Sequence, residues 1–69
     1  MDYEDILNKA IRYGEYTHNR RCSHSYVVGM VQWLLRTHDV SNLKVSDNDS
    51  AISFNTNNKH CVIKFKVCL

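Results

Sequence analysis

The sequence predicts an α+β fold in which two N-terminal helices pack on one face of a three-stranded antiparallel β-meander. Two segments with the apolar periodicity of helices come first, and three short runs that alternate apolar and polar residues follow them. Turn-forming residues separate the three runs, as they do in antiparallel hairpins. We therefore expect one small domain over residues 1–69, with the element order α-α-β-β-β.

The first helix is predicted to begin at Asp2 and to end near Gly14. The Asp2 carboxylate can accept hydrogen bonds from the first turn, and glycine commonly ends a helix. The apolar residues between them recur at steps of three and four, which gives one buried stripe made by Tyr3, Ile6, Leu7, Ala10 and Ile11. Residues 15–23 show no such period, so we expect a loop there.

The second helix, from His24 to Thr37, is the centre of the predicted core, with Ser23 or Ser25 as its N-cap. Its best buried stripe consists of Val27, Met30, Val31 and Leu34. Four more apolar residues lie off that stripe: Tyr26, Val28, Trp33 and Leu35. A helix that is apolar on most of its circumference is normally buried, but a chain of 69 residues has few elements to cover it. We therefore expect part of this helix to stay exposed until a partner covers it.

Three strands are predicted over residues 43–46, 51–55 and 61–69, with turns at 47–50 and 57–59. The alternation assigns one set of side chains to the core, where it packs on the second helix: Leu43, Val45, Ile52, Phe54, Cys61, Ile63, Phe65 and Val67. The opposite face of the sheet is expected to carry Lys44, Lys64 and Lys66.

Composition and charge bear on several classes of protein: nucleic-acid-binding, secreted, membrane-spanning and disulfide-rich. The formal net charge is +2, which is too small to indicate nucleic-acid binding by itself. The acidic start of the chain is unlike a signal peptide, and no apolar run approaches the length of about 20 residues that a membrane span needs. Three cysteines, an odd number, argue against a disulfide scaffold. We expect a cytoplasmic protein with reduced thiols.

Two groups of residues have the side-chain types of a chemical site, one of a zinc site and one of a nucleophilic site. Zinc could be held by His18, Cys22 and His24 together with His60 and Cys61, but their spacing matches no established zinc motif. Cys22 with His24 as base and Asp39 as orienting group could form a nucleophilic site, but so small a domain has little room for a pocket that excludes water. We therefore expect no enzyme activity, no bound metal and no cofactor.

Two groups of residues have the side-chain types of a binding surface, one for a protein and one for nucleic acid. Aromatic residues and arginine are enriched in interfaces, which favours a protein partner bound by Tyr26, Trp33, Tyr16, Arg20 and Arg21, unless the aromatic residues complete the core. The alternative is a nucleic-acid-binding module that uses Arg20, Arg21, Lys44, Lys64 and Lys66. Lysines on a small sheet also protect its edges from pairing with other chains, and no aromatic residue lies between the outer lysines for base stacking.

In general character the sequence resembles the small accessory proteins that phages and other viruses encode to bind and block a host protein, such as anti-CRISPR inhibitors. The shared features are the short chain, the absence of motifs, the many asparagines and the lack of proline. The resemblance implies steric occlusion of a host protein in the host cytoplasm, with a homodimer through the second helix as a further possibility. The positive net charge differs from that of inhibitors that mimic nucleic acid with an acidic surface.

Overall fold

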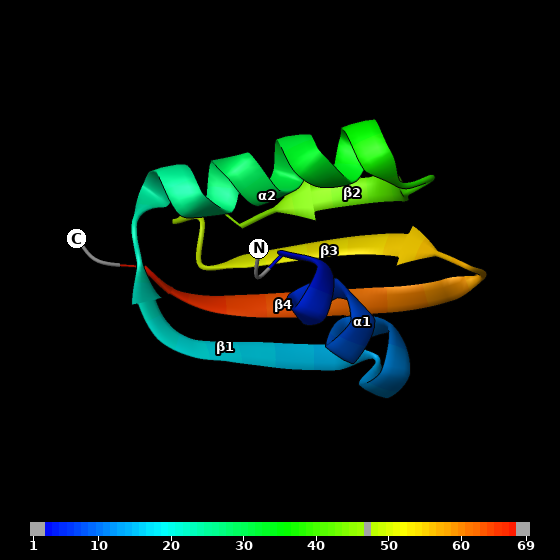
Figure 1. The fold of residues 1–69 in the computed structure, drawn as a ribbon, viewed down its shortest axis with the longest axis horizontal. Helices are drawn as coiled ribbons and strands as arrows, with labels where there is room; N and C mark the ends of the chain where they lie inside the picture. Colours follow the sequence, from blue (N-terminus) through cyan, green and yellow to red (C-terminus); the bar gives the residue numbers. More distant parts are fainter. Residues whose placement is uncertain (1–2, 47, 68–69) are drawn as a thin grey trace.

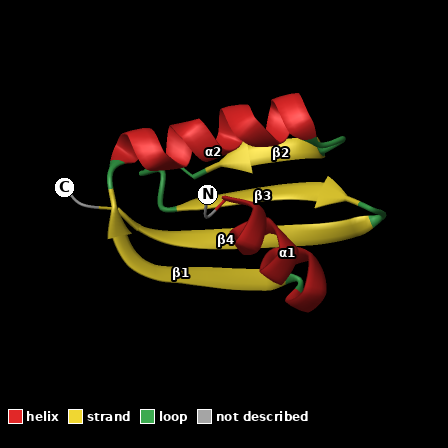
Figure 2. Cartoon of the chain, viewed as in Figure 1, coloured by secondary structure: helices red, strands yellow, loops and turns green. Residues whose placement is uncertain are grey.

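The protein, in a computed structural model that describes residues 3–46 and 48–67, contains two helices and four strands over those residues (Figure 1). The elements are α1 (Tyr3–Tyr13), β1 (Glu15–Cys22), α2 (His24–Thr37), β2 (Ser41–Val45), β3 (Ala51–Thr56) and β4 (Lys59–Val67). The strands form one mixed sheet in the order β1-β4-β3-β2, in which β1 runs parallel to β4 and the other neighbours are antiparallel (Figure 2).

The predicted fold class was wrong, because the segment predicted as a loop is strand β1. Only one helix precedes the first strand, and the sheet is four-stranded and mixed rather than a three-stranded meander. Tyr16 pairs with Ile63 and His18 pairs with Phe65. The inward positions of β1 are therefore held by two aromatic side chains that carry polar groups, instead of by aliphatic residues. The register then shifts between His18 and Arg21, which interrupts the alternation on which a strand prediction depends.

The two predicted hairpins are present as part of this larger sheet. Asn57 and Asn58 form the β3–β4 turn with φ angles of 52° and 62°, which is the backbone of a two-residue hairpin and favours asparagine. Strand β2 begins at Ser41, two residues before its predicted start, and its register shifts between Ser41 and Lys44, a segment that contains Asn42 with a φ of 55°. The predicted cap at Asp2 and the strand residues 68–69 lie outside the described residues.

Both helices cover the same face of the sheet. Their buried side chains and those of the sheet form one core, which contains Ile6, Leu7 and Ala10 of α1, Val27, Met30 and Leu34 of α2, and Ile52, Phe54, Cys61, Ile63 and Phe65 of β3 and β4. Leu43 and Val67 of the predicted inward set are half-buried and pack against this core. Val45 pairs with the buried Ile52 but is 40% exposed, contrary to the prediction, because β2 is an edge strand. No described helix lies over the opposite face.

Helix α2 has the predicted boundaries, and Ser23 caps it by accepting a hydrogen bond of 3.3 Å from the Tyr26 backbone N–H. It approaches α1 closely at Gly29. The Tyr3 hydroxyl donates a hydrogen bond of 3.0 Å to the backbone oxygen of Tyr26. A Cβ atom at Gly29 would lie 2.6 Å from that hydroxyl oxygen, so the missing side chain allows Tyr3 to reach α2.

We expect Gly29→Ala to displace the Tyr3 hydroxyl and to break this hydrogen bond, which would offset the gain of about 1 kcal/mol in helix propensity. In a Tyr3→Phe background the obstructing atom is gone, so the same alanine should raise the free energy of unfolding by about 1 kcal/mol. Urea denaturation of the four proteins in this double-mutant cycle measures the difference. Equal effects of Gly29→Ala in both backgrounds would contradict the proposed contact.

Candidate functional site

The circumference of α2 is divided between three environments. Val27, Met30 and Leu34 face the core. The flank with Tyr26 and Trp33 is covered by α1, where the Tyr3 ring lies 5.0 Å from the Tyr26 ring and 5.8 Å from the Trp33 ring between centroids. The third flank faces β2 and is not covered by a described helix. The two aromatic residues singled out from the sequence are therefore half-buried in an interhelical cluster.

The uncovered flank of α2 and the adjacent edge strand form an apolar surface. Leu35 is 60% exposed, Val28 is 38% exposed and Val45 of β2 is 40% exposed. Together with the half-buried Val31 they define what we call the α2–β2 surface. A shallow hollow of about 280 Å³ lies within it, lined by Val27, Val28, Val31, Gln32, Val45 and Asp49. The expected leftover apolar surface of the second helix is thus present, on Val28 and Leu35 rather than on Tyr26 and Trp33.

Tyr16 and Arg20 lie in a different place, on the edge strand β1 at the far side of the sheet from β2. They line a groove of about 310 Å³ against α1 with Asp5, Lys9 and His18, among others. The Lys9 Nζ atom lies 5.2 Å from the centroid of the Tyr16 ring, a cation–π contact. The five residues proposed from the sequence as a partner surface do not therefore form one continuous patch.

The face of the sheet opposite the helices carries most of the basic residues that were considered for nucleic acid. Arg21 pairs with Lys66 in the β1–β4 register, and Lys44 pairs with Ser53, whose neighbours Ile52 and Phe54 point into the core. Lys64 and Lys66 alternate with the buried residues of β4. We call this side, with Arg21, Lys44, Lys64 and Lys66, the open face. Arg20 lies on the helix side of the sheet.

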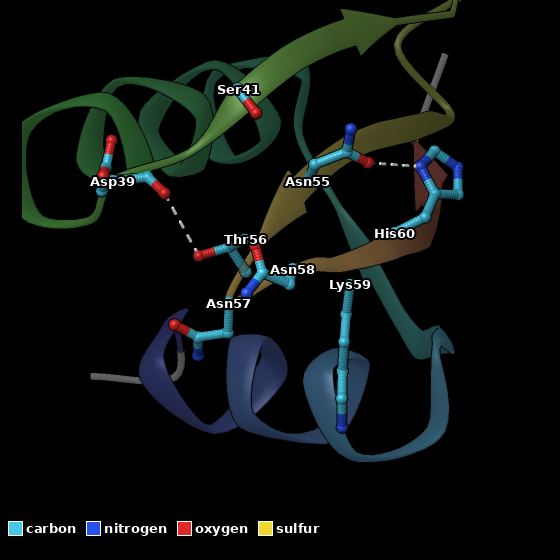
Figure 3. Close-up of a pocket in the computed structure, with 8 residues that line it drawn as sticks. All are labelled: Asp39, Ser41, Asn55, Thr56, Asn57, Asn58, Lys59 and His60. Carbon is cyan, nitrogen blue, oxygen red and sulfur yellow. Dashed lines mark hydrogen bonds between the residues drawn. The ribbon is translucent and has the colours of Figure 1, made fainter.

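A hollow of about 810 Å³ lies at the end of the sheet near the β3–β4 turn, and its lining is polar (Figure 3). The Thr56 hydroxyl donates to the Asp39 backbone oxygen over 3.3 Å, and His60 Nδ1 lies 2.8 Å from Asn55 Oδ1. In the close-up the Asn57 side chain extends to the left and the Lys59 side chain extends downward. His60 is thus paired with an amide, and the hollow holds no nucleophile positioned against a base.

The residues considered for zinc and for nucleophilic catalysis are dispersed. His18 stacks on Tyr26, with 5.7 Å between ring centroids. Cys22 is buried, and its thiol donates to the Lys66 backbone oxygen over 3.6 Å. His24 is exposed and contacts the carboxylate of Asp49 rather than Asp39. Within residues 3–46 and 48–67, no three His, Cys, Asp or Glu side chains come together in a way that could hold a metal ion.

Burial raises the pKa of the Cys61 thiol above its ordinary value, against a smaller opposing effect of Lys59. Burial also raises the pKa of the Tyr3 hydroxyl, and the neighbouring Cys22 adds to that rise. In both cases the folded state favours the neutral form, so alkaline conditions stabilise the unfolded chain relative to the folded one.

We expect the contribution of Cys61 to the free energy of unfolding to be constant below about pH 8.5, where the thiol is protonated in both states. This contribution should be lost as the pH rises through the higher pKa of the folded state. Cys61→Ser, which removes the ionisable thiol, should flatten the decline that begins above about pH 8.5. Urea titrations of both proteins across this range measure the effect. Parallel stability profiles would show that Cys61 does not contribute.

Comparison with known proteins finds no matching protein family, no matching curated protein and no matching solved structure. Neither described helix is long and apolar enough to cross a membrane. The surfaces described above are therefore the basis on which a function can be proposed.

Proposed function

We propose that the protein acts by binding another protein through the α2–β2 surface and has no chemistry of its own. The observation that carries this proposal is the exposure of Leu35, at 60%, on the same helix flank as Val28 and Val31, which line a hollow together with Val45 of β2. Exposed leucine is common on proteins, but here it belongs to a contiguous surface that continues along one helix flank onto a neighbouring strand. Completing the burial of Leu35, which is 60% exposed, contributes about 1–2 kcal/mol of hydrophobic free energy to association.

The layout of α2 supports a docking surface rather than an incomplete core. The core side of the helix is fully packed, since Val27, Met30 and Leu34 are all 0% exposed. The aromatic flank is closed by Tyr3. Polar side chains, among them Gln32 and Asp49, border the remaining apolar flank and give it a rim of the kind that surrounds interface cores.

The finer expectations remain predictions. Inhibition of a host protein by steric occlusion, of the anti-CRISPR type, requires a specific target, and the α2–β2 surface specifies a kind of contact rather than a target. A cytoplasmic location and a homodimer through the second helix are likewise predictions. Because a second copy of the chain and a different protein would both use Leu35, a single substitution can report on either.

We expect Leu35→Glu to abolish association while leaving the fold intact, because a charge at this exposed position is tolerated in the monomer but not in an apolar contact. Asn8→Glu adds the same charge at an exposed position of α1 and serves as the matched control. The buried neighbour Leu34 gives the opposite behaviour, since Leu34→Ala should lower the free energy of unfolding by about 2–5 kcal/mol.

Sedimentation equilibrium of the purified proteins reports self-association, and affinity capture from the producing cells, read by mass spectrometry, reports other partners. Circular dichroism confirms folding of each variant. The proposal requires an association that Asn8→Glu retains and Leu35→Glu loses. Associations that Leu35→Glu leaves unchanged, or the absence of any association by either measurement, would overturn it.

A further inference from the structure

The open face combines cations with small neutral side chains. Its central rows contain Ala51 and Ser53 of β3, which register with Lys64 and Val62 of β4. Lys66 and Arg21 follow at one end of the face, and Lys44 lies beside Ser53 on the edge strand β2. Since the side chains between the cations are short, a large flat ligand can approach the sheet closely.

Protection of sheet edges does not account for Lys64 and Lys66. Lysines protect edge strands because an edge has unpaired backbone groups. A meander that ended in the last strand would place these two residues on an edge, but in the observed order β1-β4-β3-β2 they belong to an interior strand. Their backbone is paired on both sides, with β1 and with β3. The two charges therefore call for another explanation.

The charge on this face is strongly one-sided. Four of the nine basic residues of the chain lie on it, against one described acidic residue, Glu15. The Lys64 Nζ atom lies 3.3 Å from Glu15 Oε2, and both side chains are more than half exposed. An exposed pair of this kind is worth little in water, so Lys64 remains available to a competing anion. The ligand expected on such a surface is a polyanion.

We propose that the open face binds the phosphate backbone of a nucleic-acid duplex. Two strand spacings of about 4.8 Å separate β2 from β4, so Lys44 lies about 10 Å across the sheet from the strand of Lys64 and Lys66, which is comparable to the width of a duplex groove, about 6–12 Å. Cations at this separation can contact phosphates on both sides of a groove. The contacts are to the backbone, so the binding is independent of sequence.

Two other polyanionic partners fit the face less well. Single strands are normally held by aromatic side chains on which bases stack, and the described residues of this face include no Phe, Tyr or Trp. The imidazole of His60 lies near one end of the face, where its Nδ1 atom is paired with Asn55 Oδ1. Anionic membranes are bound by surfaces that also insert large apolar side chains, whereas Val62 and Ala51 are the apolar residues that the described strands present here. The face thus has the charge for phosphate without the apolar groups that the other partners use.

Fluorescence anisotropy with labelled 20-base-pair DNA and RNA duplexes tests the proposal, with the corresponding single strands and phosphatidylserine vesicles as competing ligands. For three or four phosphate contacts, the logarithm of the binding constant should fall with the logarithm of salt concentration with a slope of about −3. Lys64→Gln/Lys66→Gln should make this slope shallower by about 1.8 and weaken binding at low salt by about tenfold or more. Glu15→Gln, which removes the carboxylate beside Lys64, should strengthen binding.

The matched control is Lys9→Gln/Arg36→Gln, which removes the same charge from the two helices. It should retain the wild-type slope, whereas an effect of net charge alone would weaken both double variants equally and overturn the proposal. No duplex binding at about 50 mM salt, tighter binding to single strands, or binding to vesicles without binding to duplex would overturn it as well. Preference for DNA or RNA duplex identifies which backbone the face accepts.

Discussion

The parallel pairing of β1 with β4 is the constraint on which the rest of the structure depends. It joins β1, the segment between the two helices, to the sheet beside β4, so β4 becomes an interior strand. With β4 in the interior, its alternating residues divide cleanly into Cys61, Ile63 and Phe65 in the core and Lys64 and Lys66 outside. Both helices then pack on the apolar side, because that is where one sheet face and two apolar stripes can be buried together.

The parts of the fold that local pattern determines were predictable from the sequence. The boundaries of α2, its Ser23 cap and the alternation of β3 and β4 all follow from periodicity and capping. Strand β1 was missed because Tyr16 and His18 occupy its inward positions and a register shift breaks the pattern after them. The alternation of Tyr16 and His18 around the β-favouring residue Thr17 was the one available signal. Which flank of α2 remains uncovered depends on where α1 packs. The position of α1 is set by tertiary contacts, which a short stretch of sequence does not reveal.

The α2–β2 surface and the open face differ in chemistry and in position. One is apolar and belongs to the side of the sheet that carries the helices, and the other is basic and lies on the side without them. Neither contains a reacting group, and the sheet lies between the two surfaces, so a partner proposed for one would not block the other. A small protein built in this way would hold a protein partner beside a nucleic-acid backbone. The role of the fold is to separate the two surfaces by a single layer of strands.

Both outer strands of the sheet carry a register shift, between His18 and Arg21 in β1 and between Ser41 and Lys44 in β2. Strand β1 has two extra residues relative to β4 at its shift, and β2 has one relative to β3. Extra residues in an outer strand interrupt the row of donors and acceptors that a further strand would need. Irregular outer strands of this kind disfavour the addition of a further strand, whether in a fibril or by strand exchange between molecules. Asn42, a left-handed residue within the shifted part of β2, contributes to this protection at one edge of the sheet.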